Sequence, residues 1–151
     1  MALQDGPGVA LPGTWYLERW EIAYDDGRPP TLPFGEGATG MLVYTEDGSM
    51  AACIARAGRA RFAAESPRAA PEAARAAAFD SFFAYAGAWS LREAEGRAQV
   101  VHEVREALNP GFVGTEQVRD MALEGDRLTL SASDTLPGST ALRHHRLIWR
   151  R

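Results

Sequence analysis

Three side chains in the second half of the chain have the types and spacing needed to move a proton. They are His102, Glu106 and Arg119. Histidine titrates near neutral pH, a carboxylate can orient its ring, and an arginine can stabilise an enolate. Residues four apart on one strand point to the same side, which puts His102 and Glu106 on one face. We predict a proton-transfer site built from these three residues; a buried polar network that only sets strand register is the alternative.

Aromatic, amide and thioether side chains would surround such a site. Tyr44 and Tyr85 could donate hydrogen bonds to a ligand carbonyl, although packing of their rings in the core is the alternative. Methionine gives a binding wall that adapts its shape, and tryptophan also suits a structural role that closes one end of the fold. The remaining predicted ligand contacts are Gln117, Phe83, Met50, Met121, Trp15 and Trp149.

Other kinds of site lack their sequence signals. The histidines are His102, His144 and His145, and neighbours on a strand point to opposite faces, so at most one of the adjacent pair could join His102 at a metal. Spacings typical of metal and serine-nucleophile sites (HxH, HExxH, GxSxG) do not occur, and the chain has no Walker phosphate-binding loop. Cys53 is the single cysteine, which excludes an internal disulfide and suits a small buried residue. We therefore expect no metal and no cofactor.

Length and charge narrow the class of protein. The 151 residues suit one domain. A net charge of -4 argues against nucleic acid and anionic membranes, since both attract basic surfaces. No apolar run reaches the roughly 18 residues of a membrane helix, and residues 1–13 do not resemble a signal peptide. We expect a soluble cytoplasmic protein with a loose glycine- and proline-rich arm over residues 1–12 and one domain over residues 13–151.

Turn signals divide that domain into short strands. Gly48 and Gly96 each end a polar tetrapeptide, and Gly125 lies within the tripeptide Glu124-Gly125-Asp126; all three segments are typical of a hairpin turn. The expected strands are 14–24, 39–44, 49–54, 88–92, 99–108, 115–123, 127–133 and 140–150. Such a run of about eight hairpin-linked strands predicts an antiparallel meander that closes into an all-β barrel.

One helix interrupts this pattern. Phe79, Phe82, Phe83 and Ala86 lie at helical spacing and form one apolar stripe. We predict a side helix from about Pro71 to Tyr85, with the stripe packed on the barrel or across its mouth.

Alternation along the strands indicates which side chains face inward. The faces predicted to share the interior carry His102, Val104 and Glu106; Gln117, Arg119 and Met121; His145, Leu147 and Trp149; and Trp15, Leu17, Arg19 and Glu21. Their mixed polarity favours a partly polar cavity, although irregular amphipathic strands would look the same. A buried guanidinium needs a partner, and we expect Glu106, or else Glu21, to pair with Arg119. The competing strand phase would put Val118 inside and Arg119 in water.

The order of several short motifs resembles the bacterial and fungal lipocalin-like domain family. The resemblance spans about Leu11 to Arg150 and departs from the family pattern at Gly111 and Phe112. The matching residues are Gly13-Thr14-Trp15, Pro33-Phe34-Gly35, Gly40-x-Leu42-x-Tyr44, Asp47-Gly48-x-Met50, Tyr85-Ala86-Gly87, His102-x-Val104, Gln117-Val118-Arg119, Gly125-Asp126-Arg127-Leu128 and Trp149.

This resemblance implies a lipocalin-like barrel with a side helix and a central pocket, and it leaves the reaction open. Related barrels include carriers of hydrophobic molecules and cofactor-free cyclases and isomerases of natural-product biosynthesis. We favour a cyclase or isomerase acting on a mostly apolar, polyketide-like molecule, because a plain lipid carrier needs fewer convergent polar groups. A non-catalytic carrier of a similar ligand is the alternative, and a homodimer stays open.

Overall fold

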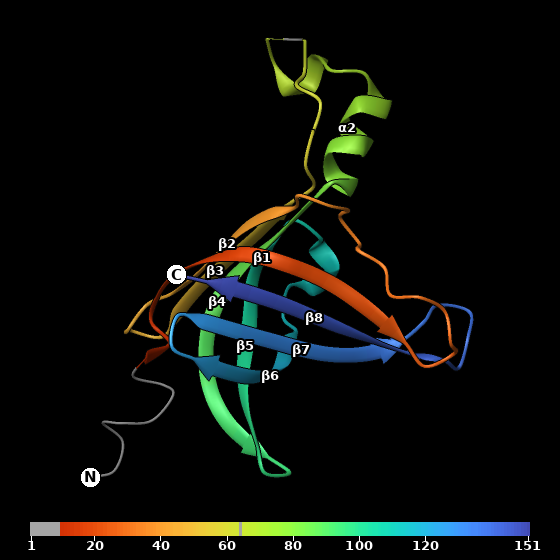
Figure 1. The fold of residues 1–151 in the computed structure, drawn as a ribbon. Coiled ribbons are helices and arrows are strands. Elements are labelled where there is room, and N and C mark those ends of the chain that lie inside the picture. Colours follow the sequence, from red (N-terminus) through yellow and green to blue (C-terminus); the bar gives the residue numbers. More distant parts are fainter. Residues whose placement is uncertain (1–9, 64) are drawn as a thin grey trace.

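Eight antiparallel strands close into a barrel in the computed structural model, which describes residues 10–63 and 65–151 (Figure 1). Each strand pairs with the next along the chain, and the last pairs with the first, so the sheet closes on itself. The predicted all-β antiparallel barrel is confirmed. Its strands are β1 (Gly13–Tyr24), β2 (Thr39–Tyr44), β3 (Ser49–Ala55), β4 (Phe82–Ala94), β5 (Arg97–Ala107), β6 (Glu116–Glu124), β7 (Arg127–Thr135) and β8 (Leu142–Arg150).

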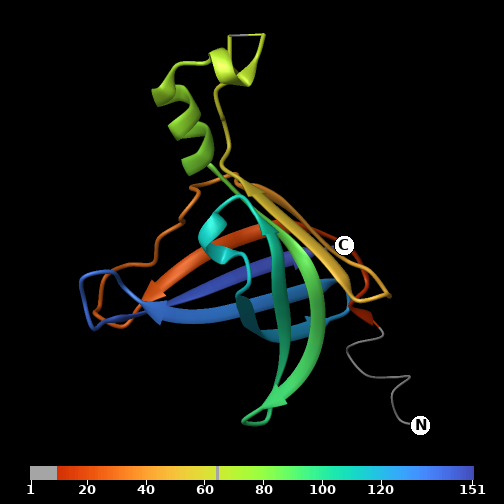
Figure 2. The ribbon, with the colours of Figure 1, turned by 180° about the vertical axis from the view of Figure 1, so that it is seen from behind.

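The predicted side helix is shorter than its sequence pattern indicates. Helix α2 covers Glu72–Asp80, and β4 begins at Phe82. Phe83 lies opposite Ile54 of β3, so pairing with a neighbouring strand overrides the helical spacing of the phenylalanines. Helix α2 stands out from one end of the barrel (Figures 1 and 2), and Phe79 is 47% exposed. The predicted packing of one helical phenylalanine stripe against the barrel is wrong.

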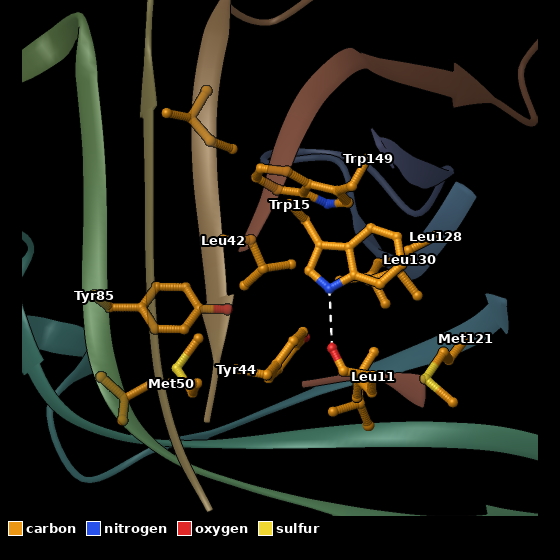
Figure 3. Close-up of a cluster of buried hydrophobic side chains, with 13 residues drawn as sticks. Leu11, Trp15, Leu42, Tyr44, Met50, Tyr85, Met121, Leu128, Leu130 and Trp149 are labelled. Carbon is orange, nitrogen blue, oxygen red and sulfur yellow. Dashed lines mark hydrogen bonds between the residues drawn. The ribbon is translucent and has the colours of Figure 1, made fainter. Parts of the chain in front are cut away.

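The opposite end of the barrel is closed by packed apolar side chains. Figure 3 shows Trp15, Leu128 and Trp149 in this cluster, where the Trp15 indole nitrogen donates to the carbonyl oxygen of Leu11 at 3.0 Å. The guanidinium of Arg151 covers the Trp15 ring at 4.3 Å from its centre. Within the predicted arm Leu11 is fully buried and Ala10 is exposed; residues 1–9 lie outside the described part. Within the described residues, no helix has the length and apolar character needed to cross a membrane.

A β-bulge in β5 reverses the direction of the side chains beyond it. Ala86 lies opposite Glu106, whereas the next pair is Gly87 with Val104, which leaves one residue of β5 over. Because side chains alternate along a strand, one extra residue changes which of them face inward. Glu106 is therefore exposed on the outside of the barrel, and its predicted place on the inward face of His102 is wrong.

A second bulge does the same in β1. The register with β8 shifts between Leu17 and Arg19. Beyond the shift Trp20 turns inward, and Glu21 forms ion pairs with Arg19 and Arg146 on the outside. Glu21 is therefore no partner for an interior arginine, and the unbroken alternation predicted for this strand is wrong.

The bulge in β5 depends on the absence of a side chain at residue 87. A Cβ atom on Gly87 would lie 1.8 Å from the carbonyl oxygen of Glu103, which is backbone and cannot move aside cheaply. We expect Gly87→Ala to lower the free energy of unfolding by about 3 kcal/mol, measured by urea denaturation. In the control, Gly111→Ala, the nearest atom is a side-chain oxygen of Asn109 at 3.2 Å. Equal losses in both variants would contradict the proposed role of the bulge.

Two phenylalanines of the predicted stripe, Phe79 and Phe83, should contribute differently to the stability of the fold. Phe83 packs against Tyr85 and Phe112 with ring centres 5.4 and 5.7 Å away. We expect Phe83→Ala to cost about 3 kcal/mol and Phe79→Ala about 0.5 kcal/mol or less, because only the first removes buried contacts. Thermal or urea unfolding measures both changes in stability. A large loss of stability in Phe79→Ala would contradict the exposed position of this side chain on α2.

Candidate functional site

The barrel contains a cavity of about 400 Å³ whose wall is apolar on one part and polar on another. A larger hollow of about 660 Å³ lies outside the barrel, between α2 and residues 56–63. We place the candidate site in the barrel because polar groups from several strands converge on this cavity, whereas the larger hollow is lined by a loop and a helix. Its apolar wall includes Leu42, Ile54, Phe83, Phe112, Leu130 and Leu147, and its polar wall includes Tyr85, His102, Gln117, Arg119, Asp134, Arg143 and His145.

His102 is held by two tyrosines deep in the barrel. The Tyr44 hydroxyl lies 2.6 Å from Nε2 and the Tyr85 hydroxyl lies 2.6 Å from Nδ1. These residues come from β2, β4 and β5, and the histidine side chain is almost fully buried. Both nitrogen atoms of the ring are therefore occupied, and the ring has one orientation.

Burial keeps this histidine neutral. Desolvation, with a smaller contribution from the positive charge of Arg119, lowers the pKa of His102 to about 3. A neutral imidazole has one N–H, so one tyrosine donates to the ring and the other accepts from it. Of the two tyrosines only Tyr85 borders the cavity. If Tyr44 donates to Nε2 and Nδ1–H donates to Tyr85, the free O–H belongs to Tyr85, where a ligand could accept it.

Arg119 lies on the cavity wall, as predicted, but it has no acidic partner there. Its guanidinium donates to the carbonyl oxygen of Val118 at 2.9 Å and to Oε1 of Gln117 at 3.2 Å. Among residues 10–63 and 65–151 no carboxylate forms an ion pair with it. The competing strand phase, with Arg119 in water, is excluded, and the expected pairing with Glu106 or Glu21 is wrong because the two bulges turn those side chains outward.

The structure separates the predicted ligand contacts into two groups. Phe83, Tyr85, Gln117 and Trp149 border the cavity together with His102 and Arg119. Tyr44 lies behind His102, and Met50, Met121 and Trp15 are buried in the packed core rather than on the cavity wall. Their alternative roles as core residues match this placement.

One buried donor on the cavity wall lacks a partner. The indole nitrogen of Trp149 is inaccessible to solvent and has no hydrogen-bond acceptor among the described residues. An unsatisfied buried N–H costs roughly 1–3 kcal/mol, and because this nitrogen has no accessible surface, a ligand in the cavity could not reach it.

Sequence reasoning missed a second polar group on the wall. The indole nitrogen of Trp20 donates to Nδ1 of His145 at 3.3 Å, and Nε2 of His145 lies 3.4 Å from Oδ1 of Asp134. Arg143 holds that carboxylate through two hydrogen bonds of 2.6 and 3.0 Å. Simple alternation from Trp15 places Trp20 on the outer face, because it does not include the bulge in β1. The sequence predicted that His145 faces inward but assigned it no role.

In the described part of the chain, no three His, Cys, Asp or Glu side chains lie close enough together to hold an ion. His144 points outward, where it contacts Ser133 and Asp25.

Replacement of His102 should change how stability depends on pH. The pKa of His102 is 6.5 in the unfolded chain and about 3 in the folded protein. Its contribution to stability is therefore fully present above pH 6.5 and is lost as the pH falls from 6.5 toward about 3. We expect wild-type stability to fall more steeply between pH 6.5 and 4 than that of His102→Gln, by up to about 1.4 kcal/mol per pH unit. At pH 7 the variant should be less stable by about 1–3 kcal/mol, because the tyrosine hydroxyls lose a partner. Urea unfolding across this pH range measures both effects, and parallel pH curves would refute the neutral histidine.

The closed eight-strand meander and its internal cavity agree with the resemblance of the sequence motifs. No curated protein and no solved structure matches the chain. The chain does match the lipocalin-like domain family over residues 12–151, which includes every strand of the barrel. A lipocalin-like barrel suggests binding of a small molecule. The chain belongs to the lipocalin-like domain family.

Proposed function

We propose that this protein binds a mostly apolar small molecule that carries a carbonyl or anionic oxygen, and that it isomerises or cyclises this molecule without a cofactor. The observation that supports the proposal is the unpaired guanidinium of Arg119 on the wall of an otherwise largely apolar cavity. The other two charged groups on that wall, Asp134 and Arg143, neutralise each other. Arg119 therefore leaves one net positive charge facing the ligand.

The apolar wall and the charge would act on different parts of the ligand. Leu42, Ile54 and Phe83 would bury its hydrocarbon body, and burial of apolar surface supplies most of the binding energy. Arg119 and the Tyr85 hydroxyl would face its oxygen. Donors fixed before the reaction stabilise an enolate more than the parent carbonyl, and this difference lowers the barrier to proton transfer next to the carbonyl.

The neutral state of His102 favours a second candidate, a carrier without turnover. Both ring nitrogens are bound to tyrosines and the low pKa leaves no proton to give at neutral pH. In that case the three residues would position Tyr85 as a fixed donor for the ligand oxygen, and the ligand would leave unchanged.

The role of Arg119 can be tested with two fluorescent probes that differ only in charge. They are 1-anilinonaphthalene-8-sulfonate and its uncharged parent N-phenyl-1-naphthylamine. We expect Arg119→Met to weaken binding of the sulfonate about tenfold or more, since a charged hydrogen bond contributes roughly 1.5–3 kcal/mol, while the neutral probe binds as before. The melting temperature should change little, because the variant breaks no ion pair. Equal weakening of both probes would count against a ligand-facing charge.

Turnover and simple carriage differ in hydrogen exchange. A ligand recovered from the protein purified from its own cells, and identified by native mass spectrometry, is returned to the protein in heavy water. An isomerase or cyclase that makes an enolate incorporates deuterium next to the carbonyl, and a carrier returns the ligand without it. Arg119→Met serves as the control for exchange that occurs outside the cavity.

A further inference from the structure

The geometry points to His145, oriented by Asp134, as the base that takes a proton from carbon inside the barrel, with a carbonyl compound bearing an acidic C–H as the substrate class. This inference rests on the proposed binding function and assigns its chemistry to a residue other than His102. It follows from three features of the cavity wall: the bonds that fix the ring, the weak occupation of one nitrogen atom, and the nearby guanidinium.

The ring of His145 has a defined tautomer. Nε2 lies 3.4 Å from a carboxylate oxygen of Asp134, which can only accept a hydrogen bond, and Nδ1 faces the N–H of Trp20, which can only donate. The proton of the neutral ring therefore belongs on Nε2, and the lone pair belongs on Nδ1. Two hydrogen bonds from Arg143 keep the Asp134 carboxylate in place.

The lone pair of Nδ1 is held only loosely. The Trp20 donor is 3.3 Å away, longer than the usual 2.9–3.0 Å of an N–H···O bond, so a substrate can compete for this nitrogen. His102 offers no such opening, because two hydroxyls at 2.6 Å occupy its nitrogens. Of the two histidines on the cavity wall, only His145 can exchange one partner for a substrate.

The charged groups around His145 leave its ring unprotonated at neutral pH. They are Asp134 on β7, Arg143 on β8 and Arg119 on β6. Burial lowers the pKa of His145 most, Asp134 opposes this, and the two arginines lower the pKa further. A general base must be neutral to accept a proton, and the Asp134 carboxylate partly offsets the loss of basicity that burial causes.

The proposed step is balanced within the cavity. Nδ1 takes a proton from the carbon next to the substrate carbonyl, and the electron pair of that C–H bond moves to the carbonyl oxygen as an enolate. Arg119, also on the wall, would stabilise this oxygen. Return of the proton to another carbon yields an isomer, and attack of the enolate carbon on an electrophilic carbon of the same molecule yields a ring.

A substrate that is not yet identified can be replaced by 5-nitrobenzisoxazole. A base removes its ring C–H proton, the N–O bond breaks as a nitrile forms, and the yellow 2-cyano-4-nitrophenolate appears. We expect wild-type protein to accelerate this reaction, and His145→Gln to reduce the acceleration at least tenfold. The matched control is His144→Gln, the same substitution at the neighbouring residue on the outer face, which should keep the wild-type rate within about twofold.

The pH profile separates a positioning role of Asp134 from a purely structural one. Asp134→Asn keeps an oxygen acceptor for Nε2–H but removes the charge that raises the pKa of His145. We expect the acid limb of the rate profile to move to lower pH and the plateau to fall several-fold, since a weaker base is slower. An acid limb at the wild-type pH would overturn the role of Asp134.

Two further measurements distinguish an error in assigning His145 as the base from an error in the proposed binding function. Equilibrium dialysis measures binding of the probe: bound probe without acceleration overturns the base and leaves the binding function, whereas absent binding counts against the binding function itself. Long-range ¹H–¹⁵N correlation spectra, assigned with His145→Gln, report the tautomer without any ligand. A proton on Nε2 supports the inference, and a proton on Nδ1 overturns it.

Discussion

Two β-bulges decide which side chains of this barrel meet the cavity. An eight-stranded barrel has room inside for its own side chains and one small ligand, so a change of one residue in strand phase changes the chemistry of the interior. The bulge in β5 turns Glu106 outward and needs Gly87 opposite it. The bulge in β1 turns Trp20 inward and Glu21 outward. Together they turn outward both carboxylates that were expected to pair with Arg119, Glu106 and Glu21.

The loss of those partners gives the cavity its asymmetry. Charges inside proteins are costly unless they are paired, and structures usually provide a partner. Here the guanidinium of Arg119 is satisfied by Gln117 and by a backbone carbonyl, both uncharged. Burial is the main cause that lowers the pKa of His102 and of His145, and the positive charge of Arg119 adds to this effect at both rings.

The two histidines differ because their partners differ. His102 lies between two tyrosine hydroxyls and acts as part of a rigid connection across β2, β4 and β5. His145 lies between a carboxylate, Asp134, and a weakly bound indole N–H. The first arrangement fixes the Tyr85 hydroxyl beside the cavity, and the second places only a long hydrogen bond on Nδ1 of His145. A cavity with both could hold a substrate oxygen at one group and remove a proton at the other.

Local sequence patterns determined the barrel, because turn residues and alternation act between neighbours along the chain. Gly48 and Gly125 marked hairpins that the structure contains, and the inward faces of His102, Arg119 and Trp149 were predicted. Strand phase beyond a bulge, in contrast, depends on how a strand pairs with its neighbour in the sheet, which no single strand encodes. For the same reason Phe83 lies in a strand paired with β3, although its spacing from Phe79 is typical of a helix. The closed barrel alone therefore decided that Glu106 lies outside. It also decided that Asp134 of the neighbouring strand β7 lies beside His145 of β8.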